Sequence, residues 1–147
     1  MIVASRVALA LAVILAGEAP VALMGQDAAV GVAWTMRNRM EIWGHTVDQI
    51  EAAYYGRGQP TEAEIEVIEQ VFAAEPWEDP TGGAFWALSR QDAEARDLPR
   101  GDLVFTSPKS AMFQVHLYRA DPFRRSDDGG AEGKRPCPPA GLARLAR

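Results

Sequence analysis

The chain begins with an almost uninterrupted apolar stretch that ends directly before a glutamate. Residues 2–16 read IVASRVALALAVILA, with Arg6 as the one charge, and Gly17, Glu18 and Pro20 follow soon after. A membrane span needs about 20 apolar residues, so this stretch is short for one. A cleavable signal peptide and a buried helix both remain open as interpretations. We expect the buried helix, because large apolar residues recur at helical spacing at Val7, Leu11, Ile14 and Leu15.

Charge divides the chain into two parts. It has 147 residues and a formal net charge of −5, and its length suits one domain. Residues 124–147 carry a charge of +3 and are rich in Gly and Pro, whereas residues 1–123 carry −8. We therefore predict a folded domain over 1–123. The tail 124–147 should be extended, or ordered only by a protein partner. The acidity of the domain argues against nucleic-acid binding.

The remaining patterns predict an α+β domain, mostly helical with a small antiparallel β element in its C-terminal half. Thr46 is a plausible helix N-cap, and Thr61 with Glu64 has the spacing of a capping box. Helices are expected at 27–40, 46–53 and 62–74, a loop at 54–60, a turn at 79–83, strands at 84–89, 103–106 and 113–118, and one or two helical turns at 91–97.

Glu18 is the first candidate for chemistry. A carboxyl at the inner end of an apolar helix is partly desolvated, which raises its pKa and keeps it protonated near neutrality. That is the state that a general acid needs. The alternative is a solvated glutamate at a helix end, where a negative charge opposes the helix dipole.

Aromatic side chains are the second candidate, because sugar rings stack on aromatic faces. At least one of Phe85 and Trp86 should belong to the core, since strand alternation sends neighbours to opposite faces. His116 is a further candidate, with a structural role as the alternative. The single cysteine, Cys137, excludes an internal disulfide, and no Cys/His set has zinc-ligand spacing. We expect neither a metal nor a cofactor.

Five short motifs occur in an order that resembles the SleB-like cell-wall hydrolases, the family of the spore-cortex-lytic transglycosylase. They are Gly17-Glu18-Ala19, a small-residue helix ending in Asn38-Arg39, Thr46-Val47-Asp48-Gln49-Ile50, Thr81-Gly82-Gly83-Ala84-Phe85 and His116-Leu117-Tyr118. The chain departs from the family pattern at Ala22, where an acidic residue is usual. It departs again at Gly58-Gln59-Pro60, which lacks the aromatic and hydroxyl residues of the family's loop.

The resemblance implies a lysozyme-like fold and cleavage of the β-1,4 bond between N-acetylmuramic acid and N-acetylglucosamine. It places the catalytic glutamate at Glu18. A lytic transglycosylase of this type uses one general acid/base and needs no second carboxylate, because the muramyl C6 hydroxyl closes a 1,6-anhydro ring. The residues expected to contact substrate are Tyr55, Gln59, Gly83, Phe85, Trp86, His116 and Tyr118.

Peptidoglycan is then the expected partner, without nucleic acid and without a transmembrane span. The protein would act at the cell wall or in the periplasm, either secreted or, if Met1 is retained, delivered by a phage-like particle or a holin. The altered loop and the basic tail favour an alternative: a non-catalytic glycan-binding or structural component of an envelope or phage-like assembly. A third possibility, a secreted protein of unrelated function, requires removal of the first helix as a signal peptide.

Overall fold

The computed structural model describes residues 5–96, 103–106 and 114–123. In it, the predicted small-residue helix is surrounded by three other predicted helices and by one additional short helix. The helices are α1 (Ser5–Glu18), α2 (Val21–Met24), α3 (Gln26–Ile42), α4 (Val47–Ala53), α5 (Glu62–Ala73) and α6 (Arg90–Ala95), with a 3-10 turn at Pro76–Glu78. The strands are β1 (Trp86–Ser89), β2 (Leu103–Thr106) and β3 (Val115–Tyr118). The expected α+β class is confirmed. The predicted tail 124–147 lies outside the described residues.

The first apolar stretch forms a helix whose large side chains are buried. Leu11, Ile14 and Leu15 of α1 are fully buried, and Val7 is partly buried against the same core. The helix runs through Gly17 and ends at Glu18, two residues beyond the apolar stretch 2–16. By length and composition alone, Ser5–Met24 could cross a membrane, a property that core helices and signal sequences share. In this fold α1 serves as a core helix.

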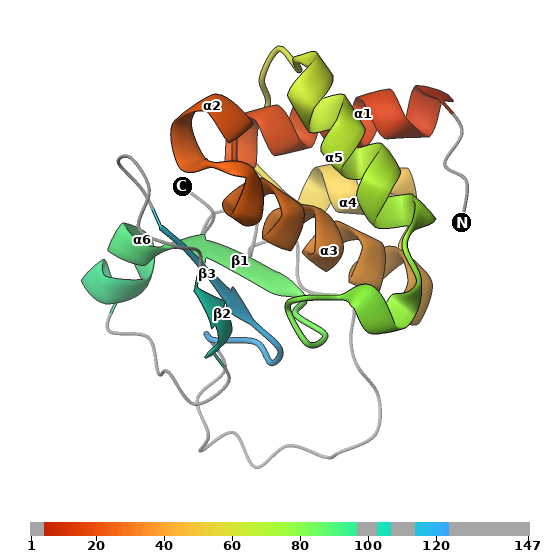
Figure 1. Ribbon diagram of the computed structural model, residues 1–147. Helices are drawn as coiled ribbons and strands as arrows, with labels where there is room; N and C mark the ends of the chain where they lie inside the picture. The colour runs from red at the N-terminus through yellow and green to blue at the C-terminus, as the bar shows by residue number, and fades with distance from the viewer. Residues whose placement is uncertain (1–4, 97–102, 107–113, 124–147) are drawn as a thin grey trace.

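Helix α3 occupies the middle of the molecule. It lies between α1, α4 and α5 on one side and the sheet on the other (Figure 1). Helix α3 is buried on nearly every face, because both layers pack against it. Small residues permit this close packing, and those that are buried are Ala28, Ala29, Gly31 and Ala33.

Polar residues at the end of α3 are buried because each one bonds to the backbone or side chain of another element. Arg37 donates to the carbonyls of Val71 and Ala74, at 2.6 and 2.5 Å, and so caps the C-terminus of α5. Asn38 donates to the Asp79 carboxylate at 2.9 Å and to the Ala84 carbonyl at 3.0 Å. The end of α3 is thereby tied both to α5 and to the turn that leads into the sheet.

Both predicted caps are present. The Thr46 hydroxyl accepts a hydrogen bond from the Gln49 N–H, and the Gln49 side chain accepts one from the Thr46 N–H. At the start of α5 the Glu64 side chain closes the box, accepting hydrogen bonds from the Thr61 N–H at 2.8 Å and from the Thr61 hydroxyl. Because caps satisfy N–H groups that the helix itself cannot, they set the first residue of each helix.

The sheet has the order β1-β3-β2, with both pairs antiparallel. Trp86 is opposite Tyr118 and Ser89 is opposite Val115. Strand β1 begins two residues later than predicted, because the preceding turn occupies more of the chain. Gly82 and Gly83 have φ angles of 62° and 94°, a region that suits glycine. The Asp79 carboxylate accepts the Thr81 and Gly83 N–H groups inside this turn.

Candidate active site

Glu18 is held at the end of α1 by the loop that follows α4. Its carboxylate accepts a short hydrogen bond from the Gly56 N–H, and the Tyr55 N–H also interacts with it. Gly56 is 38 residues away in the sequence. The side chain is therefore placed by a tertiary contact as well as by its own helix.

The loop approaches α1 so closely that only glycine fits at three positions. A Cβ atom on Gly17 would lie 2.1 Å from the backbone nitrogen of Arg57, and one on Gly56 would lie 2.4 Å from the Gly17 carbonyl carbon. A Cβ on Gly58 would lie 2.9 Å from the Ala16 carbonyl. The Gly58 N–H also donates to the Val13 carbonyl at 3.0 Å. Backbone packed directly on backbone fixes the position of the Gly56 N–H relative to Glu18.

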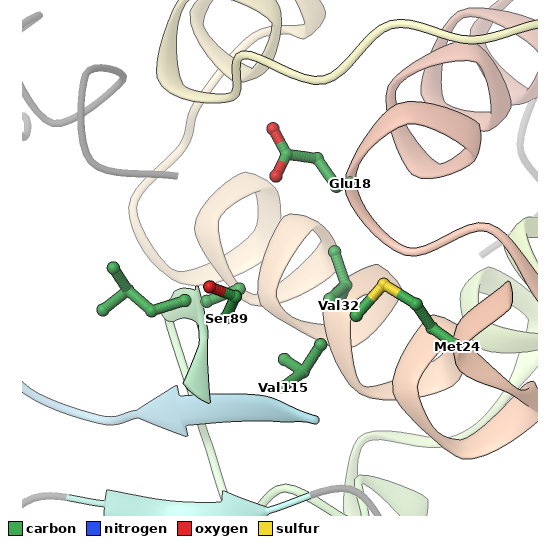
Figure 2. Close-up of a pocket in the computed structure, with 7 residues that line it drawn as sticks. Glu18, Met24, Val32, Ser89 and Val115 are labelled. Atoms are coloured by element: carbon green, nitrogen blue, oxygen red, sulfur yellow. The ribbon is translucent and has the colours of Figure 1, made fainter. Parts of the chain in front are cut away.

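A pocket of about 290 Å³, open mouth included, lies beside Glu18. Figure 2 shows Glu18 on one side of it, with Ser89 and Val115 of the strands on the opposite side. The other described lining residues are apolar: Met24, Val32, Ala87 and Leu88. Of the described residues around this pocket, Glu18 is the one with an ionisable side chain.

The surroundings raise the pKa of Glu18. Burial is the largest cause, because an apolar environment disfavours the ionised form. The backbone N–H groups of Gly56 and Tyr55, and then the charge of Arg57, act in the opposite direction without cancelling the effect of burial. A carboxyl with a raised pKa can donate a proton at higher pH, and the N–H donors stabilise the carboxylate that remains.

A second glutamate holds the chain just after Glu18. Glu64 is 2% exposed and accepts the Val21 N–H at 2.9 Å as well as the N–H and hydroxyl of Thr61. Burial alone would raise the pKa of Glu64, but the hydrogen bonds from Thr61 and Val21 outweigh it and lower that pKa. Glu64 therefore remains ionised and fixes the start of α2, which carries Met24 to the pocket.

Two of the predicted substrate contacts lie on the loop near Glu18. Tyr55 is half-buried beside Gly56, and Gln59 is exposed. Gly83 lies elsewhere, in the turn before β1, where Arg119 donates to the neighbouring Gly82 carbonyl at 2.7 Å. The structure thus brings Tyr55 next to Glu18 and places Gly83 beside Arg119, the residue that follows β3.

The predicted aromatic contacts lie in a cluster of their own, which we call the aromatic cluster: Trp43, Phe85, Trp86, Leu88, Tyr118 and Phe123. The expectation that at least one of Phe85 and Trp86 belongs to the core is confirmed, because both are buried, at 5% and 7% exposed. The Phe85 ring stacks on the Trp43 indole with 4.5 Å between ring centroids, and the Trp86 ring meets the same indole edge-on at 5.9 Å between centroids. Phe85 precedes β1 and follows the glycine turn, so strand alternation does not apply to it.

His116 is also buried, 6% exposed, on β3 with its ring 6.5 Å from that of Tyr118. Phe85, Trp86, His116 and Tyr118 are not among the described residues that line the pocket. Their role in binding substrate stays a prediction.

Arg39 lies at the centre of the aromatic cluster and was not singled out by residue chemistry. Its Nε donates to the Phe85 carbonyl at 2.7 Å, and its guanidinium lies over Trp43, Tyr54 and Trp86. The signal in the sequence was its place in the Asn38-Arg39 pair at the end of a helix. Burial lowers the pKa of Arg39.

Tyr54 interacts with both Arg39 and Glu18. Its ring is under the Arg39 guanidinium, and its hydroxyl donates to the Thr35 hydroxyl at 2.7 Å, which in turn donates to the Val32 carbonyl at 2.6 Å. Burial raises the pKa of Tyr54 and keeps it neutral. The residue therefore joins the loop that holds Glu18 to the central helix.

Comparison of the chain with protein-family models, with curated proteins and with solved structures finds no match. Within the described ranges, no group of three or more His, Cys, Asp or Glu side chains is arranged to hold a metal ion.

Proposed function

We propose that the chain cleaves peptidoglycan glycan strands at the β-1,4 bond between N-acetylmuramic acid and N-acetylglucosamine, as a lytic transglycosylase with Glu18 as its general acid/base. One observation carries the proposal. The Glu18 carboxyl lies at the end of a core helix, beside a pocket lined mainly by apolar side chains, with a raised pKa and with backbone N–H donors for its ionised form.

The arrangement of elements supports a lysozyme-like fold. A glutamate at the C-terminal end of a core helix faces a small antiparallel sheet, and the pocket lies between them. Two of the motifs that carry the family resemblance are also in direct contact. Asn38 bonds to the Asp79–Ala84 turn and Arg39 bonds to Phe85. Motifs that pack together in this way form one structural unit around α3.

The chemistry requires a single group that first donates and then accepts a proton. Protonated Glu18 gives its proton to the glycosidic oxygen as the bond to the muramyl C1 breaks. The resulting carboxylate takes the proton of the muramyl C6 hydroxyl, whose oxygen bonds to C1 and closes the 1,6-anhydro ring. Glu18 ends protonated as it began. A retaining glycosidase would instead need a second carboxylate about 5–5.5 Å away.

Binding to the cell wall would depend on short-range contacts. Residues 1–123 carry a net charge of −8, so they gain little from long-range attraction to an anionic wall polymer. The tail 124–147, with a charge of +3, is the part suited to such a polymer or to an acidic protein partner. The protein would work at the cell wall or in the periplasm.

One observation favours the alternative of a non-catalytic glycan-binding or structural component. The aromatic side chains expected to stack on sugar rings are buried, with Phe85, Trp86 and Tyr118 between 1% and 7% exposed. A binding-only protein would use the same pocket without proton transfer at Glu18.

The test compares the wild type with Glu18→Gln on purified peptidoglycan, with mass spectrometry of the released muropeptides. Glu66→Gln is the matched control, because Glu66 is exposed on α5. We expect anhydro-muropeptides from the wild type and from E66Q but not from E18Q. Reducing ends instead would indicate a hydrolytic muramidase. Equal inactivity of all three folded proteins would refute the enzyme and favour the alternative, which pull-down on peptidoglycan then measures.

A further inference from the structure

The Arg57 side chain binds three backbone carbonyls around the loop that contacts Glu18. Its guanidinium donates to Glu51 O at 2.6 Å, to Tyr54 O at 3.0 Å and to Gly56 O at 2.7 Å. Glu51 lies in the last turn of α4, and Tyr54 is the residue that ends this helix. Arg57 thus fastens the loop to the C-terminus of α4, whose carbonyls have no partners within the helix and favour a cation.

The other side of the loop is fastened to α1. The Gly58 N–H bonds to the Val13 carbonyl at 3.0 Å, and Gly56 packs against Gly17 with no room for a Cβ atom. The peptide between Tyr55 and Gly56 is therefore fixed from both sides. Of these two attachments, the one to α4 is made by a single exposed side chain.

We propose that Arg57 is a positioning residue for Glu18: by binding the carbonyls of Glu51, Tyr54 and Gly56, it holds the Gly56 N–H against the Glu18 carboxyl. Its importance for catalysis rests on the proposed function, but its effect on the carboxyl does not. A planar guanidinium with five N–H donors can bind several carbonyls at once, which an ammonium on a flexible stem does less well.

The physical consequence concerns the ionised form of Glu18. The described charged and titratable groups that act on this carboxyl are Arg57 and Tyr54. The other described residues that line the pocket beside Glu18 are uncharged. The Gly56 and Tyr55 N–H groups lower the pKa of Glu18 more than the charge of Arg57 does. Because Arg57 is exposed, water screens its charge. Its larger effect on the pKa of Glu18 is therefore indirect, through the N–H groups that it positions.

The test uses Arg57→Ala and Arg57→Lys in the full chain, with Arg96→Ala as the control, because Arg96 is also an exposed arginine. The first measurement is the pKa of Glu18 from NMR titration of side-chain carboxyl ¹³C, assigned by the signal missing in Glu18→Gln. The second is hydrogen exchange at the Gly56 amide. Neither requires activity, so the proposal can be judged even if peptidoglycan is not cleaved.

We expect R57A to raise the pKa of Glu18 and to speed exchange at Gly56, R57K to do nearly the same, and R96A to match the wild type. If the protein is active, the alkaline limb of its kcat/KM profile should move to higher pH in both Arg57 variants. An unchanged pKa and unchanged exchange in R57A would overturn the proposal. So would an R57K protein that titrates like the wild type, because charge alone would then explain the effect. Unfolding of R57A would leave the decision to R57K.

Discussion

Replacing Gly56 with alanine should unlock the loop from α1 and lower the stability of the protein. The new Cβ would lie 2.4 Å from Gly17 C and 2.5 Å from Glu18 N, both backbone atoms. Ordinary van der Waals contact begins at about 3.4 Å, so the loop must move away by roughly 1 Å. Such a movement breaks the Gly56–Glu18 hydrogen bond and strains the Gly58–Val13 bond.

The size of the effect follows from these contacts. Each lost hydrogen bond costs about 1 kcal/mol, with more for a charged partner. Gly56 is not among the glycines with positive φ, so alanine suits its backbone and returns about 0.4–1 kcal/mol through the unfolded state. The expected net loss is roughly 2 kcal/mol, which lowers the Tm of a chain of this size by about 4–8 °C.

Differential scanning calorimetry and urea unfolding measure this change. Gly44→Ala is the control, because its Cβ would have nothing within 4 Å but its φ of 70° disfavours alanine. Both variants should lose stability, and only G56A should also raise the pKa of Glu18 and reduce any peptidoglycan cleavage. A G56A protein with the Tm and the Glu18 pKa of the wild type would show that the loop does not pack on α1 as described.

Two further predictions concern the opposite pKa shifts of two glutamates. Because the pKa of Glu18 is raised on folding, its ionisation destabilises the native state as pH rises above about 4. Glu18→Gln should therefore have a higher Tm than the wild type at neutral pH and an equal one in acid; a gap that persists below pH ~3.5 would contradict this. The pKa of Glu64 is lowered. Its contribution to the stability of the fold is therefore complete above the unfolded-state pKa, and it disappears as pH falls through the folded-state pKa. Glu64→Gln should cost roughly 1–2 kcal/mol at neutral pH, and thermal unfolding across pH should show the gap closing in acid rather than widening.

Local patterns were sufficient for much of the fold. The Thr46 and Thr61 caps, the apolar spacing of α1 and the glycine turn before β1 each depend on residues within a few positions of one another. The short helix α2 escaped prediction, since its N-terminal N–H is satisfied by Glu64, 43 residues away. The packing of the aromatic cluster was not predicted either, because strand alternation says nothing about Phe85, a residue outside the strand.

The sequence by itself determined where the longer helices lie, which side of α1 is apolar, and that a glutamate stands where this helix ends. Only the tertiary structure decided the pKa of that glutamate and the groups that bond to it. Its pKa depends on burial beside residues of α3 and the sheet, and on N–H groups supplied by a loop 38 residues away. Desolvation and hydrogen bonding act over a few ångströms in space, so a linear pattern can name Glu18 but cannot set its proton affinity.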